Sequence, residues 1–131
     1  RLYNLVSCLS SMFDVSVSDS FIAQHAVTID GVEEIQHEHD WKVTAVVSGE
    51  TLDVDGLVVD FLQLQKDLHE VVGALVDTNL NTNAVLDGKN PSTEIVAMYI
   101  ATELAKRVPS PARLYCVELT EAPNCIATYR L

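Results

Sequence analysis

Three histidines in the first third of the chain have the residue type and spacing of a metal site. His37 and His39 are two residues apart, so their side chains share a face if this segment is a β-strand. His25 ends the preceding apolar segment, and a hairpin would place it across from that pair. Three imidazoles on rigid strands bind Zn²⁺ and leave a fourth position for water or substrate, as in catalytic zinc sites. The alternative interpretation is a set of exposed histidines on a strand.

Alternating apolar residues predict the two strands that must hold these histidines, over residues 13–27 and 39–49. The Asp30-Gly31 pair predicts the loop between them. Apolar residues at helical spacing then predict a helix over residues 61–75, with His69 on its solvated side.

A second helix is predicted from residue 90 to residue 107. Asn90 is expected to cap it, and Pro91 suits its first position. Two final strands are expected near residues 113–120 and 125–130. This order of elements predicts a single α+β domain over residues 1–131, an antiparallel four-stranded sheet with two helices on one face. The open edges of such a sheet favour pairing between subunits, and hence a homo-oligomer.

Composition excludes several classes of partner. Hydrophobic residues make up 48% of the chain, which suffices for a core, and the net charge is −11. A strongly acidic protein repels phosphate backbones and anionic membrane surfaces, so we expect no nucleic-acid and no membrane partner.

The three cysteines, Cys8, Cys116 and Cys125, are expected to be reduced and buried in strands. Their odd number, without a recognisable secretory signal, predicts a cytoplasmic location.

Several motifs, taken in order, resemble those of the 6-pyruvoyl-tetrahydropterin synthases and the related 6-carboxy-tetrahydropterin synthases. FIAQH at residues 21–25 is similar to the F-x-A-x-H of that family, and HEHDW at residues 37–41 to its H-G-H-N-Y. LN at residues 80–81 and NPSTE at residues 90–94 are similar to its L-N and N-P-T-x-E. VELTE at residues 117–121 resembles the strand that ends in the family's pterin-anchoring glutamate.

The resemblance implies a fold, a ligand and a set of roles. The fold is the T-fold, whose subunits join their sheets into a barrel, typically a homohexamer of two stacked trimers with active sites between subunits. It implies that His25, His37 and His39 bind Zn²⁺ and that Glu121 anchors a pterin substrate. A carboxylate offers two acceptors to two adjacent donors of the heterocycle, which makes the pair strong and directional.

The sequence departs from the family at the residues that transfer protons. The family has a cysteine shortly before its H-x-H, but residues 30–36 contain none, and Glu33 stands four residues before His37. The family's L-D-H-x-x-L-N aligns with residues 75–81, where Asp77 takes the place of the histidine or, with a gap, of the aspartate. The usual base and its partner are therefore missing.

Four functional hypotheses follow. The favoured one is a zinc enzyme that acts on the C6 side chain of a dihydroneopterin triphosphate-like substrate, with Glu33 (or Glu34) as base and Asp77 assisting. Some family members with glutamate at the cysteine position cleave that side chain toward folate precursors. The second is a standard synthase, which is a carbon–oxygen lyase. The third is a pterin-binding protein without catalysis, and the fourth is a zinc-free structural oligomer.

Overall fold

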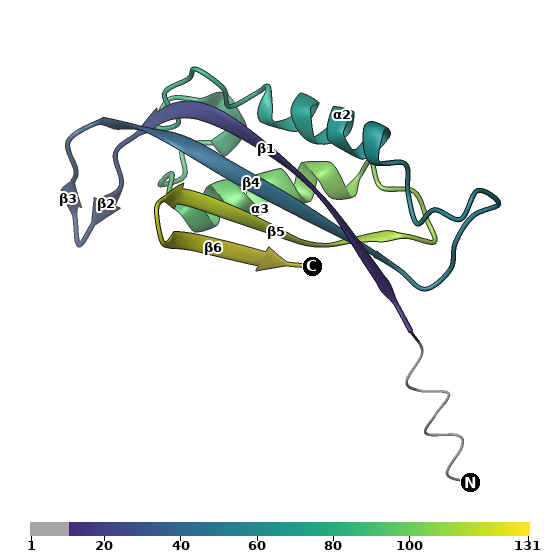
Figure 1. Ribbon diagram of the computed structural model, residues 1–131. Helices are drawn as coiled ribbons and strands as arrows, with labels where there is room; N and C mark the ends of the chain where they lie inside the picture. The colour runs from purple at the N-terminus through teal and green to yellow at the C-terminus, as the bar shows by residue number, and fades with distance from the viewer. Residues whose placement is uncertain (1–10) are drawn as a thin grey trace, which may run out of the picture.

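The computed structural model describes residues 11–131, which form one antiparallel sheet covered by two helices on the same face (Figure 1). The strand order is β1 (Phe13–His25), β4 (His37–Gly49), β5 (Arg113–Ala122) and β6 (Cys125–Arg130). The covering helices are α2 (Phe61–Val72) and α3 (Thr93–Ala105). The predicted α+β class, with a four-stranded sheet and two helices on one face, is confirmed.

The long hairpin of β1 and β4 is the frame on which the site is built. Its thirteen pairs run in unbroken register from Phe13 opposite Gly49 to His25 opposite His37. Alternate residues of β4 face the helices and are 0% exposed, as the sequence pattern predicted. They are Trp41, Val43, Ala45 and Val47. Because pairing is uninterrupted, the face taken by this apolar row is also the face taken by the histidines at the strand end.

Helix α2 begins after Asp60, whose side chain accepts a hydrogen bond from the Leu62 backbone N–H. It ends at Val72, three residues earlier than predicted, because the chain turns at Gly73. Leu75 is nevertheless buried in the core. Apolar periodicity therefore correctly identified the buried residue but overextended the helix.

Helix α3 starts later than predicted, so the expectation that Asn90 caps it and Pro91 opens it is wrong. Ser92 is the cap, with its hydroxyl accepting a hydrogen bond from the Ile95 backbone N–H at 3.2 Å. Asn90 instead bonds the backbone of Thr28. Asparagine and serine have similar capping propensities, and here the asparagine joins this loop to β2 instead.

The end of the hairpin is more structured than the sequence indicated. β1 ends at His25, two residues before the predicted end at residue 27. β4 begins at His37, two residues before the predicted start at residue 39. Between them, β2 (Thr28–Ile29) and β3 (Val32–Glu33) form a small second hairpin that projects beyond the sheet (Figure 1). A short 3₁₀ helix, η1 (Ala84–Leu86), lies in the connection before α3.

The cysteine and histidine expectations away from the site have mixed outcomes. Cys116 is buried as predicted, whereas Cys125 is exposed, so its assignment to the packed interior is wrong. Cys8 lies outside the described residues. The His69 side chain is 79% exposed, as expected, and its Nδ1 lies 2.9 Å from Asp19 Oδ2. In residues 11–131, no helix has both the length and the apolar character needed to cross a membrane.

Candidate metal and pterin site

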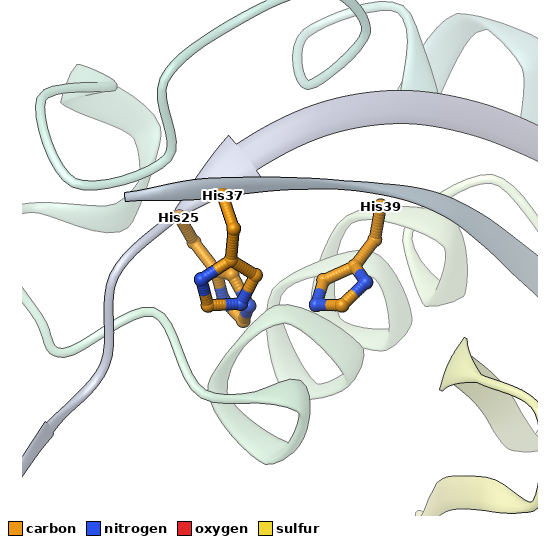
Figure 2. Close-up of side chains that lie close together, drawn as sticks. All are labelled: His25, His37 and His39. Carbon is orange, nitrogen blue, oxygen red and sulfur yellow. The ribbon is translucent and has the colours of Figure 1, made fainter. Parts of the chain in front are cut away.

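Three imidazoles converge beneath the end of the β1–β4 hairpin, as the spacing predicted (Figure 2). The register sets His25 opposite His37, and His39 follows on the same face of β4. One ring nitrogen from each of the three lies within 4.8 Å of the others. The ring centroids of His25 lie 4.7 Å from His37 and 5.1 Å from His39. The interpretation as scattered surface histidines is therefore wrong.

Backbone carbonyls orient two of the three rings. His25 Nδ1 lies 2.8 Å from the Pro91 carbonyl oxygen, and His37 Nδ1 lies 2.7 Å from the Ile35 carbonyl oxygen. A carbonyl only accepts hydrogen bonds, so each Nδ1 carries the proton and donates it. In the neutral form of each ring, Nε2 is then the nitrogen that can bind a metal. This arrangement, in which the outer nitrogen bonds a carbonyl, is typical of metal-binding histidines.

Two of the nitrogens that face the centre of the cluster lack a hydrogen-bond partner among the described residues. Within the described chain, His25 Nε2 and His39 Nε2 are buried without a hydrogen bond. An unpaired buried polar atom costs about 1–3 kcal/mol. Burial is the main cause that lowers the pKa of His39; nearby His25 and His37 also lower it, and Glu121 opposes the shift. The neutral, metal-binding form is therefore favoured, and these residues fit zinc.

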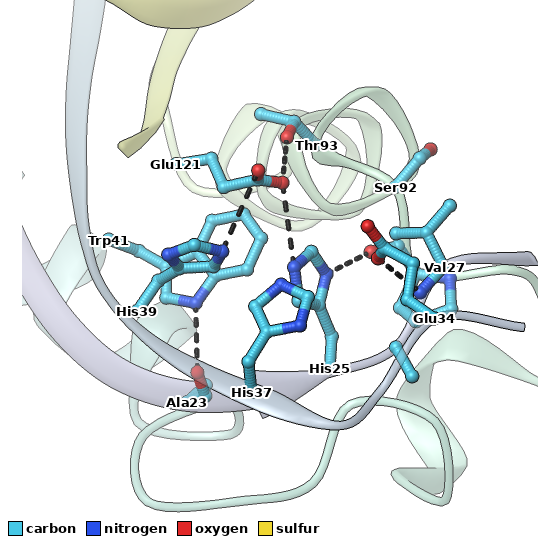
Figure 3. A network of polar contacts seen from close by, with 12 residues as sticks. Ala23, His25, Val27, Glu34, His37, His39, Trp41, Ser92, Thr93 and Glu121 are labelled. Atoms are coloured by element: carbon cyan, nitrogen blue, oxygen red, sulfur yellow. Dashed lines mark hydrogen bonds and ion pairs between the residues drawn. The ribbon is translucent and has the colours of Figure 1, made fainter. Parts of the chain in front are cut away.

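Glu121, at the end of β5, lies directly across from these nitrogens (Figure 3). Its Oε1 is 3.6 Å from His25 Nε2, and its Oε2 is 3.6 Å from His39 Nε2. The Thr93 hydroxyl, at the start of α3, donates a 2.7 Å hydrogen bond to Oε1. The Glu121 side chain is 25% exposed, so it is part of the site and is open on one side. A carboxylate so placed has acceptor capacity left for a ligand.

Trp41 closes the inner side of the site. It is fully buried, and its ring centroid lies 4.9 Å from that of His25 and 5.6 Å from that of His39, edge to face in both cases. Its indole N–H donates a 3.2 Å hydrogen bond to the Ala23 carbonyl on β1. The aromatic ring therefore limits how far either imidazole can rotate and keeps water from reaching the cluster through the core.

The family description 6-pyruvoyl tetrahydropterin synthase matches residues 14–131. The chain belongs to this family. A dihydroneopterin monophosphate aldolase from Pyrococcus furiosus is 39% identical over 78% of this chain and 83% of its own length. The 6-pyruvoyl tetrahydrobiopterin synthase of Homo sapiens is 33% identical over 72% of this chain and 66% of its own length.

Solved structures agree on the fold of the family. The Caenorhabditis elegans 6-pyruvoyl tetrahydropterin synthase superposes with a TM-score of 0.79 at 24% identity, covering 92% of this chain and 96% of that one. A Plasmodium vivax 6-pyruvoyltetrahydropterin synthase, in which a catalytic glutamate is changed to alanine, superposes with a TM-score of 0.76 at 18% identity. It covers 92% of this chain and 98% of that one. At these identities the likeness establishes the T-fold of one subunit.

The two adjacent glutamates before His37 occupy different positions. Glu33 is exposed on β3, opposite Thr28, and within residues 11–131 no hydrogen bond or ion pair joins its side chain to a histidine. Glu34 is also exposed, but its Oε1 accepts a 2.8 Å hydrogen bond from the Val27 backbone N–H. Its charge also acts to raise the pKa of His39, against the larger effect of burial. Of these two glutamates, Glu34 is therefore the one bonded to the segment that follows His25 (Figure 3).

Asp77 lies away from the histidines of its own chain. It is exposed, has a φ of 58°, and lines a polar pocket of about 280 Å³ together with Gln24 and Glu38. These two residues point to the sheet face opposite the histidines, since their neighbours in β1 and β4 face the helices. Asp77 is therefore not part of the histidine cluster of its own chain.

Two contributors to the site were not assigned from the sequence. The Thr93 hydroxyl orients Glu121, and the Pro91 carbonyl orients His25. Both residues belong to the NPSTE segment, which was interpreted as a helix start. The available signal was the similarity of that segment to a family motif. A helix start requires neither the proline carbonyl nor the threonine hydroxyl, so the helix prediction gave no reason to assign these groups to the site.

Proposed function

We propose that the chain is a zinc-dependent aldolase that binds a dihydroneopterin phosphate and cleaves the carbon–carbon bond between the first two atoms of its C6 side chain. The products are a hydroxymethyl dihydropterin and a phosphorylated glycolaldehyde. The observation that carries the proposal is Glu34, whose carboxylate is hydrogen-bonded to the backbone two residues after His25, in a loop that contains no cysteine. The similarity to the Pyrococcus furiosus aldolase supports this choice over a synthase.

Each part of the chemistry has a residue in the cluster. Glu121 accepts hydrogen bonds from the donor edge of the pterin, with Thr93 holding one of its oxygens. His25, His37 and His39 would hold zinc, which supplies Lewis-acid polarisation of the side-chain hydroxyls when bound. Glu34 removes the proton from the second hydroxyl, the bond between the two carbons breaks, and its electrons are taken up by the conjugated ring. A proton returned to the first carbon completes a redox-neutral reaction.

The exposed edges of the sheet support assembly. Among residues 11–131, β6 pairs with β5 along one edge, and β1 pairs with β4 along one edge and is bonded by residues 77–80 at Ile22 and Gln24 on the other. The remaining length of both outer edges keeps unpaired backbone groups. Ile22 on β1 and Ile126 on β6 are 43% and 56% exposed. We propose that these edges join in the homohexamer implied by the family, which also lets Asp77 approach a neighbouring site. Light scattering should then give six times the mass of one chain.

The test is product analysis with the zinc-loaded protein. It is incubated with dihydroneopterin monophosphate and, separately, with the triphosphate, and the products are identified by mass. Hydroxymethyl dihydropterin with phosphorylated glycolaldehyde supports the aldolase. Release of inorganic phosphate or triphosphate with a pyruvoyl product identifies a synthase instead. Tight pterin binding without any product identifies a binding protein.

The adjacent glutamates are matched control variants. Glu34→Gln is expected to lower kcat by about 10²–10⁴-fold, the usual contribution of a general base, while zinc stays bound. Glu33→Gln, one residue away and exposed, is expected to leave kcat within about threefold. The reverse outcome would make Glu33 the base, as the spacing to His37 first suggested.

A further inference from the structure

The segment that follows His25 has β3 on one side and is held on its other side by side chains. Asn81 binds both backbone groups of Ala26: its Oδ1 accepts from the Ala26 N–H at 2.8 Å, and its Nδ2 donates to the Ala26 carbonyl at 2.7 Å. A carboxamide is suited to this task because it carries a donor and an acceptor side by side. Asn81 thus takes the place of a strand partner at the residue next to His25.

Asn90 repeats the arrangement two residues further along. Its Oδ1 accepts from the Thr28 N–H at 2.9 Å, and its Nδ2 donates to the Thr28 carbonyl at 3.0 Å. The next residue, Pro91, supplies the carbonyl that accepts from His25 Nδ1. One loop therefore holds both the backbone after His25 and the outer nitrogen of its ring.

Val27, which lies between Ala26 and Thr28, is hydrogen-bonded to Glu34. Val27 donates its N–H to Glu34 Oε1 at 2.8 Å, and the Glu34 N–H donates to the Val27 carbonyl at 3.0 Å. Successive N–H groups of an extended backbone point in opposite directions. With Ala26 and Thr28 fixed toward the asparagines, the Val27 N–H is directed to the other side, where Glu34 lies.

We propose that Asn81 and Asn90 are positioning residues, which fix residues 26–28 and thereby hold Glu34 and His25 in their places at the site. The part of this inference that concerns Glu34 rests on the proposed function, whereas the part that concerns His25 and zinc does not. Neither asparagine touches the reacting atoms. Each acts through hydrogen bonds to the backbone, so loss of its carboxamide loosens the site without removing any group that binds metal or pterin.

Asn83 is a matched control in the same loop as Asn81. Its Nδ2 donates to the Ala74 carbonyl at 2.7 Å and to Thr78 Oγ1 at 3.0 Å, and its Oδ1 accepts from the Val85 N–H at 3.1 Å. Its side chain therefore makes three hydrogen bonds where that of Asn81 makes two, but to the turn after α2 and to η1 rather than to the segment beside His25. Asn83→Ala measures what a general loss of stability does to the protein.

The experiment compares Asn81→Ala, Asn90→Ala and Asn83→Ala in three measurements on the full chain. Chelator competition should show that the first two bind zinc at least about tenfold more weakly, the usual effect of removing a residue that orients metal ligands. Hydrogen exchange should be faster over residues 26–34 in the first two, in the zinc-free and the zinc-loaded protein. Their kcat for the dihydroneopterin phosphate should fall about tenfold or more. KM should stay within about threefold, because Glu121 and Thr93 lie on other elements.

Asn81→Asp provides a second variant with the same shape. It keeps the acceptor for the Ala26 N–H but loses the donor to the Ala26 carbonyl, so it should show the same three changes even if the alanine variant folds poorly. Zinc affinity and exchange over residues 26–34 that match those of Asn83→Ala would overturn the proposal. If the wild type turns over no pterin, the aldolase assignment fails, but the zinc and exchange comparisons still decide the role of the asparagines.

Discussion

Replacing His25 by alanine should abolish the stabilisation of this protein by zinc. The ring is fully buried, and its Nε2 is one of two in the cluster without a protein partner in residues 11–131. With alanine there, two of the three nitrogens remain, which no longer make the three-ligand set of a zinc site. His69→Ala is the matched control, because that side chain is 79% exposed and lies on α2.

The size of the effect follows from ligand linkage. Zinc present at about 100 times its dissociation constant stabilises the folded state by about 2.7 kcal/mol. For a domain of this length, each kcal/mol shifts Tm by about 3–5 °C, so chelation should lower Tm of the wild type by about 10 °C. The alanine variant also loses packing, but this loss is the same with and without chelator. The difference between the two conditions therefore isolates the metal.

Calorimetry with and without EDTA, together with the zinc content of the purified protein, measures this difference. We expect a shift of about 10 °C for the wild type and for His69→Ala, and less than about 2 °C for His25→Ala. Equal shifts in all three proteins would show that zinc binds elsewhere. The metal site itself would be refuted if the wild type contained no zinc after loading and had the same Tm with and without EDTA.

Three further predictions concern residues around the site. Glu121→Gln should weaken pterin binding about 10- to 100-fold in a titration, the loss expected for a charge-assisted pair, and leave the zinc content unchanged; full affinity would exclude the anchor role. Trp41→Phe, which removes a buried ring and its N–H, should lower the free energy of unfolding in urea by about 1–3 kcal/mol, and a neutral outcome would contradict the packing described. In a Cys8→Ser background, Cys125 should react readily with a thiol reagent at pH 8, whereas Cys116 should react only on unfolding. Burial is the main cause that raises the pKa of the Cys116 thiol, so little thiolate is present at that pH; equal rates would refute this.

The sequence by itself determined the type of fold and the histidine cluster. The alternation of Trp41, Val43, Ala45 and Val47 specified which side of β4 is buried, and a period of two carried that side on to His39 and His37. The spacing of these histidines therefore predicted their common face. Similarity to family motifs added Glu121, which lies where a ligand beside that face can reach it.

Only the tertiary structure decided which residues of the loops face the cluster. Glu33 and Glu34 are the same residue type in adjacent positions and both are exposed, but after the β2–β3 hairpin only the Glu34 side chain bonds the Val27 N–H. Asn90 has the propensity of a helix cap, yet it bonds Thr28, 62 residues away in the chain. Contacts of such long range depend on how separate elements pack, and local propensity carries no information about them.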